Sequence, residues 1–596
     1  MPGPTGDDRL LRRDYLLLIA FCIVLFGVSL ISGRPLSIHE AVLPQSARTM
    51  LDDADWIVPK RGGAPWLESP PLPQWVTVCL AMPLGRCDKV WIARMGPTLM
   101  STCVVLMVAW MASRWFGRTI GLLSGFIMAT TCQFVRYAWL AEDEMFLCAI
   151  VTAALALFTK LEFSDSNTDQ ANTTSEQGFL REFLGSRSWL MLAFFFVLGM
   201  TNLAKGLLFG TTMVLIPIFG FLLWNADVRR IMRYSWLWGW LTFAVVALAW
   251  PLAAYWRFPD VLDLWVFDLG GRLTGDYTAI NEPVWYYPLN LLWILAPWSL
   301  VVPFAFWATR HQALKQRYSP QRFVWCWALL VPAVFSIPHG KHHHYLLHSI
   351  APWAILSSFG LVWIRQWILS WPRAARNPLT GLFTIAIPTL IALWLLRERI
   401  VGPDWITHTV MLACPIVGVG LAWVLLHKNA RFAAGGLFSF LLVVYVFGHW
   451  YAGTYVDKHR KDAVFLQQVR QFRPAEAPLL VDLSVEGFRA FFCLFYLDRS
   501  ALPLHNLSFV FDDRIRDKEV YLVTQYRRRE QLQQIGTLEV VLQSEQTGGE
   551  RSIEDRLTLF RMNYHTNVPR VSSANARISP MQSMYRQDGP YLGRRL

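Results

Sequence analysis

Several acidic side chains stand directly beside long apolar runs, where they could act on a substrate at a membrane surface. Glu142, Asp143 and Glu144 follow one another immediately before one such run, and Glu40 follows the first run. A carboxylate in such a place can remove a proton from a hydroxyl or an amine as a general base. Taken one at a time, each acid is better explained as a solvated loop charge or a helix cap. Because the acids gather in two loops, we favour a catalytic role for the set.

Three cations, Lys205, Arg272 and Lys341, also border apolar runs. Grouped on one rim, they could hold a phosphate or pyrophosphate leaving group. The alternative for each is snorkelling, in which the charged end of the side chain reaches for lipid headgroups. The sequence leaves both explanations open.

Four histidines lie close together, at His339 and at His342, His343 and His344. Consecutive histidines on one helix point in different directions, whereas tetrahedral metal sites need spaced ligands. We therefore predict no metal site here and expect one of these histidines to form a hydrogen bond to substrate. The sequence supports no firm prediction of a cofactor, and a divalent cation is the alternative.

The composition is that of a polytopic membrane protein. Of 596 residues, 54% are hydrophobic and 16% are charged. The apolar residues come in blocks of about 20, which is enough to cross a hydrocarbon core of about 30 Å as helices. The net charge of +13 fits basic cytoplasmic loops better than nucleic-acid binding. We predict an all-α transmembrane domain with about thirteen helices, at residues 14–32, 94–112, 119–137, 145–161, 187–203, 207–224, 234–256, 285–308, 323–338, 344–364, 378–396, 405–426 and 432–452.

The Lys and Arg residues of the loops predict the orientation in the plasma membrane. Arg12 and Arg13 precede the first run, and every second loop after it is basic, apart from a nearly neutral linker at 162–186. If the basic loops are cytoplasmic, the N-terminus lies inside and a long first loop, residues 33–93, lies outside. The acids, cations and histidines named above then all face outwards. This agreement is the main argument from the residues for a site at the outer surface.

The chain changes character after the last apolar run. Residues 1–455 form the predicted transmembrane domain, whereas residues 456–565 alternate strand-like and helical segments. We predict a small extracytoplasmic α/β domain there. The remaining tail, residues 566–596, is polar and is predicted to be disordered. The strand-like segments are 479–484, 519–525, 538–543 and 557–562.

Short motifs of the transmembrane region resemble those of the GT-C superfamily of polyprenyl-phosphate-sugar-dependent glycosyltransferases. They are most similar to the branch of the aminoarabinose transferases and protein O-mannosyltransferases. Each motif alone is weak, but their shared order makes the resemblance specific. The matching residues are 39-HE-40, 55-DWIVP-59, 68-ESPPLPQW-75, 139-WLAEDEM-145, Lys205-Gly206, Arg272, 285-WYY-287, 297-PW-298 and 341-KHHHY-345.

The resemblance implies a membrane enzyme that moves a sugar from a polyprenyl-phosphate donor to a lipid, protein or glycan acceptor, among membrane lipids. It assigns catalysis to Glu40, His39, Glu144 and Asp143. It assigns the donor phosphate to Lys205, Arg272 and Lys341, and other substrate contacts to Glu68, His344, Tyr345 and Tyr287.

Three positions depart from the family pattern. The first-loop Asp, the presumed base in the family, is His39 here, the Lys of its Lys-Pro-Pro motif is Ser69, and its second Asp is Glu144, with Asp143 adjacent. An imidazole with a pKa near 6.5 can act as a base, but we prefer a carboxylate base with His39 orienting the acceptor. The alternatives are a polysaccharide ligase or oligosaccharyltransferase with a lipid-diphosphate donor, a non-catalytic paralogue and, less favoured, a lipid transporter.

Overall fold

The structure is a computed structural model of the 596-residue chain. Arg272, the predicted helices 378–396 and 405–426 and the predicted tail lie outside the residues that it describes. The described residues are 9–61, 64–163, 186–226, 228–266, 282–371, 427, 429–456, 460–472, 477–482, 489–497, 501–504, 519–534, 536–545 and 553–564.

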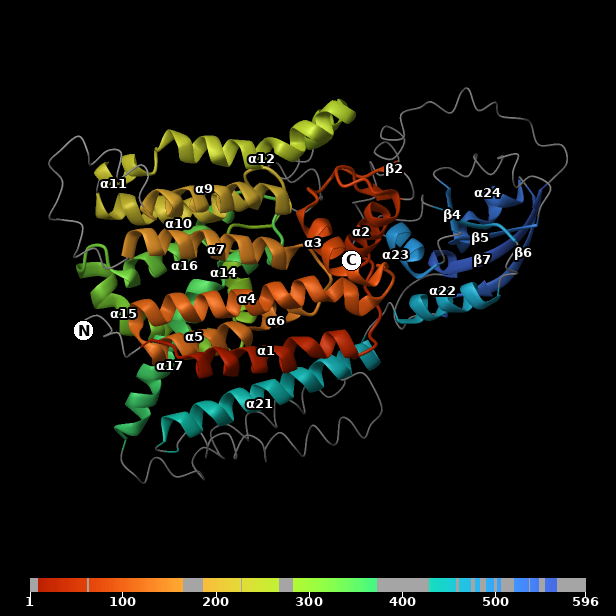
Figure 1. Ribbon diagram of the computed structural model, residues 1–596. Coiled ribbons are helices and arrows are strands. Elements are labelled where there is room, and N and C mark those ends of the chain that lie inside the picture. Colours follow the sequence, from red (N-terminus) through yellow and green to blue (C-terminus); the bar gives the residue numbers. More distant parts are fainter. Residues whose placement is uncertain are drawn as a thin grey trace.

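Long apolar helices lie side by side and form the body of the molecule (Figure 1). Six of the described helices are long and apolar enough to cross a membrane. A mostly helical, multi-pass membrane protein is therefore confirmed. The six are α1 (Arg12–Ile31), α4 (Val90–Phe116), α7 (Glu144–Phe163), α9 (Ser186–Lys205), α12 (Leu237–Arg257) and α21 (Ala430–Tyr451).

Two further candidate spans are bent. The helix α14 (Tyr286–Ile294) meets the η3–α15 helix (Trp298–Lys315) at 109°, and η4 (His343–Ser349) meets α17 (Ala351–Leu369) at 68°. A proline, which lacks the N–H that a continuing helix needs, stands at each bend. With each bent pair counted as one span, the described residues contain up to eight. The total of thirteen stays a prediction.

Shorter helices complete the bundle. The predicted helix 119–137 is split in two at Thr130 and Thr131, because the Cys132 amide donates to the distant Ala296 carbonyl at 2.8 Å instead of to the preceding turn. The shorter helices are α5 (Arg118–Ala129), α6 (Cys132–Ala138), α10 (Phe209–Asn225), α11 (Val228–Arg233) and α16 (Pro320–Phe335).

The first loop folds over one end of the bundle, the end that faces the C-terminal domain (Figure 1). It contains α2 (Val42–Asp53), the antiparallel pair β1 (Lys60–Arg61) and β2 (Ala64–Pro65), and α3 (Leu72–Ala81) with η2 (Met82–Leu84). The loop before α7 contacts the first loop, because the Ala141 amide donates to Glu40. The end of α9 and the helix η4 both contact the first residue of α7. The segments that the loop charges assign to one side of the membrane therefore do lie together.

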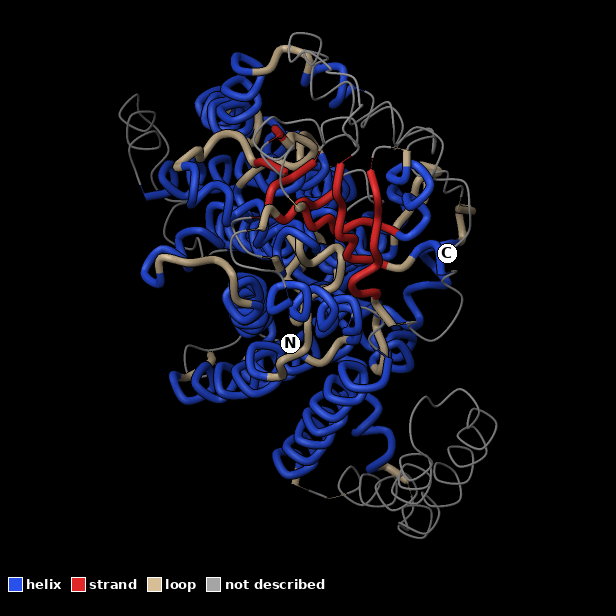
Figure 2. Tube along the Cα trace, turned by 90° about the vertical axis from the view of Figure 1, so that its right-hand side faces the viewer, coloured by secondary structure: helices blue, strands red, loops and turns tan. Residues whose placement is uncertain are grey.

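The C-terminal domain is built on a five-stranded mixed sheet, seen as one cluster of strands in Figure 2. The strands β4, β3 and β5 are parallel, whereas β7 runs antiparallel to β5 and β6. Strands occur at all four predicted segments, while β4 was not predicted. In spatial order the strands are β4 (Ala501–Leu504), β3 (Leu479–Asp482), β5 (Val520–Gln525), β7 (Leu557–Tyr564) and β6 (Gly536–Gln543). The helices of this domain are α22 (Arg460–Phe472), α23 (Arg489–Tyr496) and α24 (Arg529–Gln533).

The C-terminal domain packs on the first loop through α23. The Arg48 guanidinium of α2 donates to the carbonyls of Leu494 at 2.7 Å and Phe495 at 3.4 Å. The Leu36 amide donates to the Tyr496 hydroxyl at 2.8 Å. Buried apolar residues of the two parts form one continuous core. The first loop is therefore enclosed between the bundle and the C-terminal domain.

A buried ion pair holds the beginning of the first loop against α4. Arg94 donates from Nε to Glu40 Oε1 at 3.0 Å, and both side chains are 0% exposed. The other guanidinium N–H groups of Arg94 donate to the carbonyls of Ser29, Arg34 and Pro35. Breaking such a pair is costly, because it leaves the remaining charge buried and uncompensated.

The common end of the bundle allows a test of orientation. Cysteines introduced by Ser69→Cys or Gly340→Cys should react with a membrane-impermeant thiol reagent added to spheroplasts, because the loop charges predict that this end faces outwards. The parent protein gives the background from the natural cysteines. Labelling that appears only after the membrane is permeabilised would contradict the predicted orientation.

The buried pair makes a prediction about stability. Arg94→Met should lower the free energy of unfolding by about 3–5 kcal/mol, because Glu40 would lose its only buried cationic partner among the described residues. Thermal unfolding in detergent measures the change. Arg86→Met is the matched control, since Arg86 pairs with Asp88 at the surface and should matter by less than about 1 kcal/mol. Equal destabilisation by the two variants would argue against the anchoring role.

Candidate active site

Three segments bring polar side chains together at the end of the bundle that the first loop covers. The loop between α6 and α7 supplies Glu142 and Asp143, and α7 begins at Glu144. Helix α9 ends at Lys205, and η4 carries His344. Helix α7 packs against both α9 and η4, so its first turn lies between them. We call these five residues, with His348 of η4, the acid–histidine cluster.

Lys205 bridges two of the acids. Its ammonium lies 3.2 and 3.1 Å from the two carboxylate oxygens of Asp143 and also donates to Glu144. The side chains of Lys205 and Glu144 are 17% and 3% exposed, so little water screens their attraction. The helix dipoles support the arrangement, because an acid begins α7 and a cation ends α9.

Two histidines of η4 contact the same carboxylate. His344 Nε2 lies 3.4 Å from Glu144 Oε1, and His348 Nε2 lies 3.3 Å from Oε2. His348 Nδ1 lies 3.3 Å from the Tyr345 carbonyl oxygen. The Tyr345 ring packs edge-on against His344, with 4.8 Å between ring centroids. Glu144 is thus enclosed by one ammonium and two imidazoles.

Glu142 lies in the same cluster without such a partner. Its side chain is half-buried, and in the described part of the chain no group forms a hydrogen bond or an ion pair with its carboxyl. Loss of water, together with the carboxylates of Glu40, Glu144 and Asp143, raises the pKa of Glu142 to about 8, and Lys205 offsets only part of this rise. At neutral pH the protonated form therefore predominates.

The adjacent residues His39 and Glu40 differ in exposure: His39 is exposed and Glu40 is buried. Besides Arg94, Glu40 accepts from the amides of Ala141 at 3.0 Å and Ser37 at 2.8 Å. Burial alone would raise the pKa of Glu40, but Arg94 and these amides hold it below its usual value. Glu40 therefore fits an anchoring role better than the predicted role of catalytic base. His39 remains accessible at the same end of the bundle.

The predicted cations are not equivalent. Lys341 is buried and its ammonium donates to the Glu282 carbonyl at 2.6 Å, and beside it the Tyr287 hydroxyl donates to the His342 carbonyl at 3.2 Å. Lys341 therefore joins two segments of the chain. Of these two lysines, it is Lys205 that contacts the acids Asp143 and Glu144. Arg272, the third predicted cation, lies outside the described residues. Glu68 is half-buried in the first loop.

The segment 55-DWIVP-59 fastens the first loop to α12. The Asp55 carboxylate pairs with Arg257 at 2.9 Å and also accepts from the backbone amides of Ile57 and Val58. The Trp250 indole donates to the Ile57 carbonyl at 2.7 Å. This motif therefore positions the first loop in two ways: through the turn whose amides donate to Asp55, and through its two contacts with α12.

Sequence reasoning did not single out His348, Arg94 or Arg257. Arg94 offered a signal, because a charge inside an apolar run needs a buried partner. His348 follows His344 by four residues, but that spacing does not reveal that both reach one carboxylate. The partner of Arg257 is 202 residues away in the chain, and no local pattern identifies it.

Metal binding has no support in the described ranges, where no group of three or more His, Cys, Asp or Glu side chains is arranged to hold an ion.

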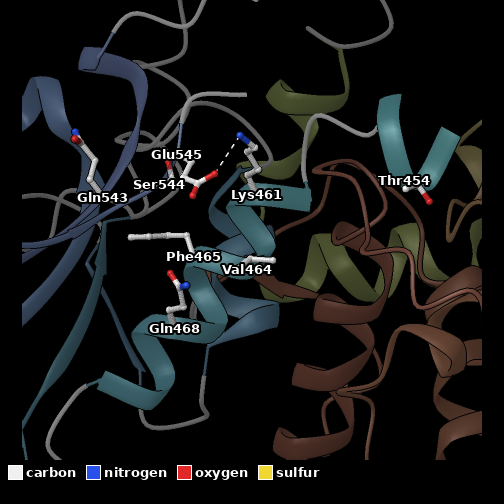
Figure 3. Close-up of a pocket in the computed structure, with 8 residues that line it drawn as sticks. All are labelled: Thr454, Lys461, Val464, Phe465, Gln468, Gln543, Ser544 and Glu545. Atoms are coloured by element: carbon white, nitrogen blue, oxygen red, sulfur yellow. Dashed lines mark ion pairs between the residues drawn. The ribbon is translucent and has the colours of Figure 1, made fainter. Parts of the chain in front are cut away.

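A cavity of about 340 Å³ lies apart from the cluster, beside α22. Figure 3 shows Lys461 turned towards Glu545, with which it forms an ion pair at 3.1 Å. The lining includes none of the predicted site residues, so we assign the cavity no part in the chemistry. It is lined by Thr454, Lys461, Val464, Phe465, Gln468, Gln543, Ser544 and Glu545.

Known proteins share parts of this sequence. Residues 47–265 match the family model of dolichyl-phosphate-mannose-protein mannosyltransferase. An undecaprenyl phosphate-alpha-4-amino-4-deoxy-L-arabinose arabinosyl transferase of Pseudomonas aeruginosa (strain UCBPP-PA14) is 27% identical over 369 residues, which cover 58% of this chain and 59% of that protein. A second protein with this description, transferase 1 of Pseudomonas fluorescens, is 26% identical over 440 residues, which cover 71% of this chain and 74% of that protein. The chain thus spans little more than half the length of the first of these relatives.

Solved structures share the fold. The crystal structure of ArnT from Cupriavidus metallidurans bound to undecaprenyl phosphate has a TM-score of 0.68 and 18% sequence identity, and the match covers 92% of this chain and 97% of that chain. Its apo state gives the same TM-score with 17% identity. In part of its sequence the chain is thus similar to polyprenyl-phosphate-sugar-dependent transferases, and it shares its fold with ArnT.

Proposed function

We propose that this protein transfers a sugar from a polyprenyl-phosphate donor to a lipid, protein or glycan acceptor at the outer face of the membrane. The observation that carries the proposal is the acid–histidine cluster, which lies beside the first loop in a fold shared over nearly the full length of ArnT. The ArnT structure contains undecaprenyl phosphate, and the relatives are described as transferases that use an undecaprenyl-phosphate sugar.

The chemistry needs a base for the acceptor and cations for the leaving group. A carboxylate removes the proton from the acceptor hydroxyl or amine, the acceptor attacks the anomeric carbon with inversion, and the bond from that carbon to the phosphate oxygen breaks. The polyprenyl phosphate leaves with the bonding electron pair. We assign its phosphate to Lys205, Lys341 and Arg272. An ammonium has three N–H donors, of which Lys341 uses one on Glu282, whereas Lys205 would exchange a contact with Asp143 for the phosphate.

A transfer assay tests the proposal. The purified full-length protein is incubated with labelled polyprenyl-phosphate sugars and a membrane extract, and the lipid, protein and glycan fractions are then counted. We expect label to appear in one fraction and to require both protein and donor. No transfer from any of the sugars, by protein that is folded and binds undecaprenyl phosphate, would favour a non-catalytic role.

The three cations make a prediction about the affinity for the donor phosphate. Lys205→Ala, Arg272→Ala and Lys341→Ala should each weaken the binding of undecaprenyl phosphate by about 1.5–3 kcal/mol, because each removes a charge-assisted hydrogen bond. A direct binding titration in detergent measures this. Lys89→Ala, which changes an exposed lysine of the first loop, is the control and should bind normally. Unchanged affinity in all three variants would leave snorkelling as the role of these cations.

The exposed histidine makes a third prediction. If His39 orients the acceptor through one neutral hydrogen bond, worth about 0.5–1.5 kcal/mol, His39→Ala should lower kcat by roughly 2- to 12-fold. His39→Asp, which restores the family residue, should keep or raise kcat. Complete loss of turnover in His39→Ala, with recovery in His39→Asp, would instead identify position 39 as the base.

A further inference from the structure

Three successive acids at the start of α7, two in the preceding loop and one in the helix itself, have different surroundings. Asp143 and Glu144 share the ammonium of Lys205. Glu142, directly before them, has a carboxyl without a hydrogen-bond or ion-pair partner in the described ranges. The backbone amide of the preceding residue, Ala141, donates to Glu40. The backbone on both sides of Glu142 is therefore fixed, while its own carboxyl is available.

The groups that face Glu142 come from several elements. They are the carboxylate of Glu40 in the first loop, the two acids that follow it, the Lys205 ammonium of α9 and, on α6, the Tyr137 phenol. With one ammonium for three carboxylates of the loop, a third full negative charge is poorly balanced. This is the physical reason why Glu142 holds its proton to higher pH than an ordinary glutamate.

We propose that Glu142 is the general base of the sugar transfer, in the role that the family gives to the residue replaced here by His39. The inference rests on the proposed function. The Glu142 carboxylate takes the proton of the acceptor hydroxyl, the acceptor oxygen bonds to the anomeric carbon, and the polyprenyl phosphate leaves with the electron pair of the broken bond. Glu142 is then a neutral carboxylic acid, and its proton passes to the released phosphate or to water.

The other acids of the site are less suited to this step. Glu40 is fully buried, and its carboxylate already accepts three hydrogen bonds. Asp143 holds Lys205 through both of its oxygens. The oxygens of Glu144 already face the Lys205 ammonium and two imidazoles. Among the described residues, no hydrogen-bond or ion-pair partner has to be displaced from the Glu142 carboxyl first. Its pKa of about 8 also makes it a stronger base than an ordinary carboxylate, while a useful fraction remains ionised near neutral pH.

Substitution of this residue separates catalysis from binding. Glu142→Gln should lower kcat by about 100-fold or more, while the affinity for undecaprenyl phosphate stays within about twofold, because the phosphate contacts are untouched. Glu142→Asp should keep part of the activity, since it retains a carboxylate. Asp53→Asn, an exposed acid of the first loop that pairs with Lys60, is the matched control and should transfer sugar normally.

The pH dependence identifies the base by a second route. A catalytic carboxylate must be ionised, so kcat/KM of the wild type should fall as the pH drops below about 8. An acid limb well below pH 8 would count against Glu142: it would point to an ordinary carboxylate, or to His39, whose imidazole pKa is held below its usual value by loss of water. Infrared difference spectra between pH 7 and 9 should show loss of a protonated-carboxyl band in the wild type and no such band in Glu142→Gln.

The outcomes distinguish this inference from the proposed function. Wild-type transfer with undiminished turnover in Glu142→Gln overturns the role of Glu142 and leaves the glycosyltransferase in place. The same holds if the wild type is active but the carboxyl band is absent. A wild type that transfers sugar from no donor overturns the function and the base together.

Discussion

The buried pair of Arg94 and Glu40 determines where the rest of the site can lie. The guanidinium reaches the end of α1 and the beginning of the first loop through backbone carbonyls. The carboxylate accepts, in addition, from the amide of Ala141 in the loop before α7. One carboxylate thus joins the first loop, α4 and the loop that carries the acids. In apolar surroundings such a network is stable only when every donor and acceptor is paired, so it fixes one geometry.

The acid–histidine cluster is built on unequal charge. Three neighbouring carboxyls meet one ammonium, and the imidazoles of His344 and His348 lie against the acid that is already best paired. This places positive partners on one side of the cluster and leaves the other side acidic. A substrate phosphate and an acceptor hydroxyl need opposite environments, since the first needs donors and the second needs an acceptor of its proton. The asymmetry provides both within one site.

The sequence predicted much of the fold, because membrane helices must satisfy a simple length and polarity requirement. Each apolar run within the described residues corresponds to a helix or a bent pair of helices. Loop charge also grouped the polar segments at one end of the bundle. The breaks were not predictable in the same way. The split at Thr130 and Thr131 depends on a hydrogen bond from the Cys132 amide to the distant Ala296 carbonyl, and hydropathy contains no information about that contact.

The site was predicted only in outline, since pairing depends on contacts between distant segments. Lys205 looked like a free phosphate ligand, yet it is held by two acids that precede it by about sixty residues. Glu40 looked like a base at an exposed edge, yet it is completely enclosed. The adjacent positions Glu142, Asp143 and Glu144 looked equivalent in the sequence. Their differences arise from α9 and η4, whose packing against α7 the sequence did not reveal.

The contact between α23 and the first loop has a consequence for how the protein is made. The Leu36 amide and the Tyr496 hydroxyl that join these parts are 460 residues apart in the chain, and a common apolar core surrounds them. At translation speeds of about 5–20 residues per second, the ribosome needs roughly 25–90 s to reach the second partner after the first. During that time part of the apolar surface of the first loop remains uncovered. A segment made early in synthesis is therefore completed by one made much later, and a chain that terminates before α23 would leave that surface exposed to quality control.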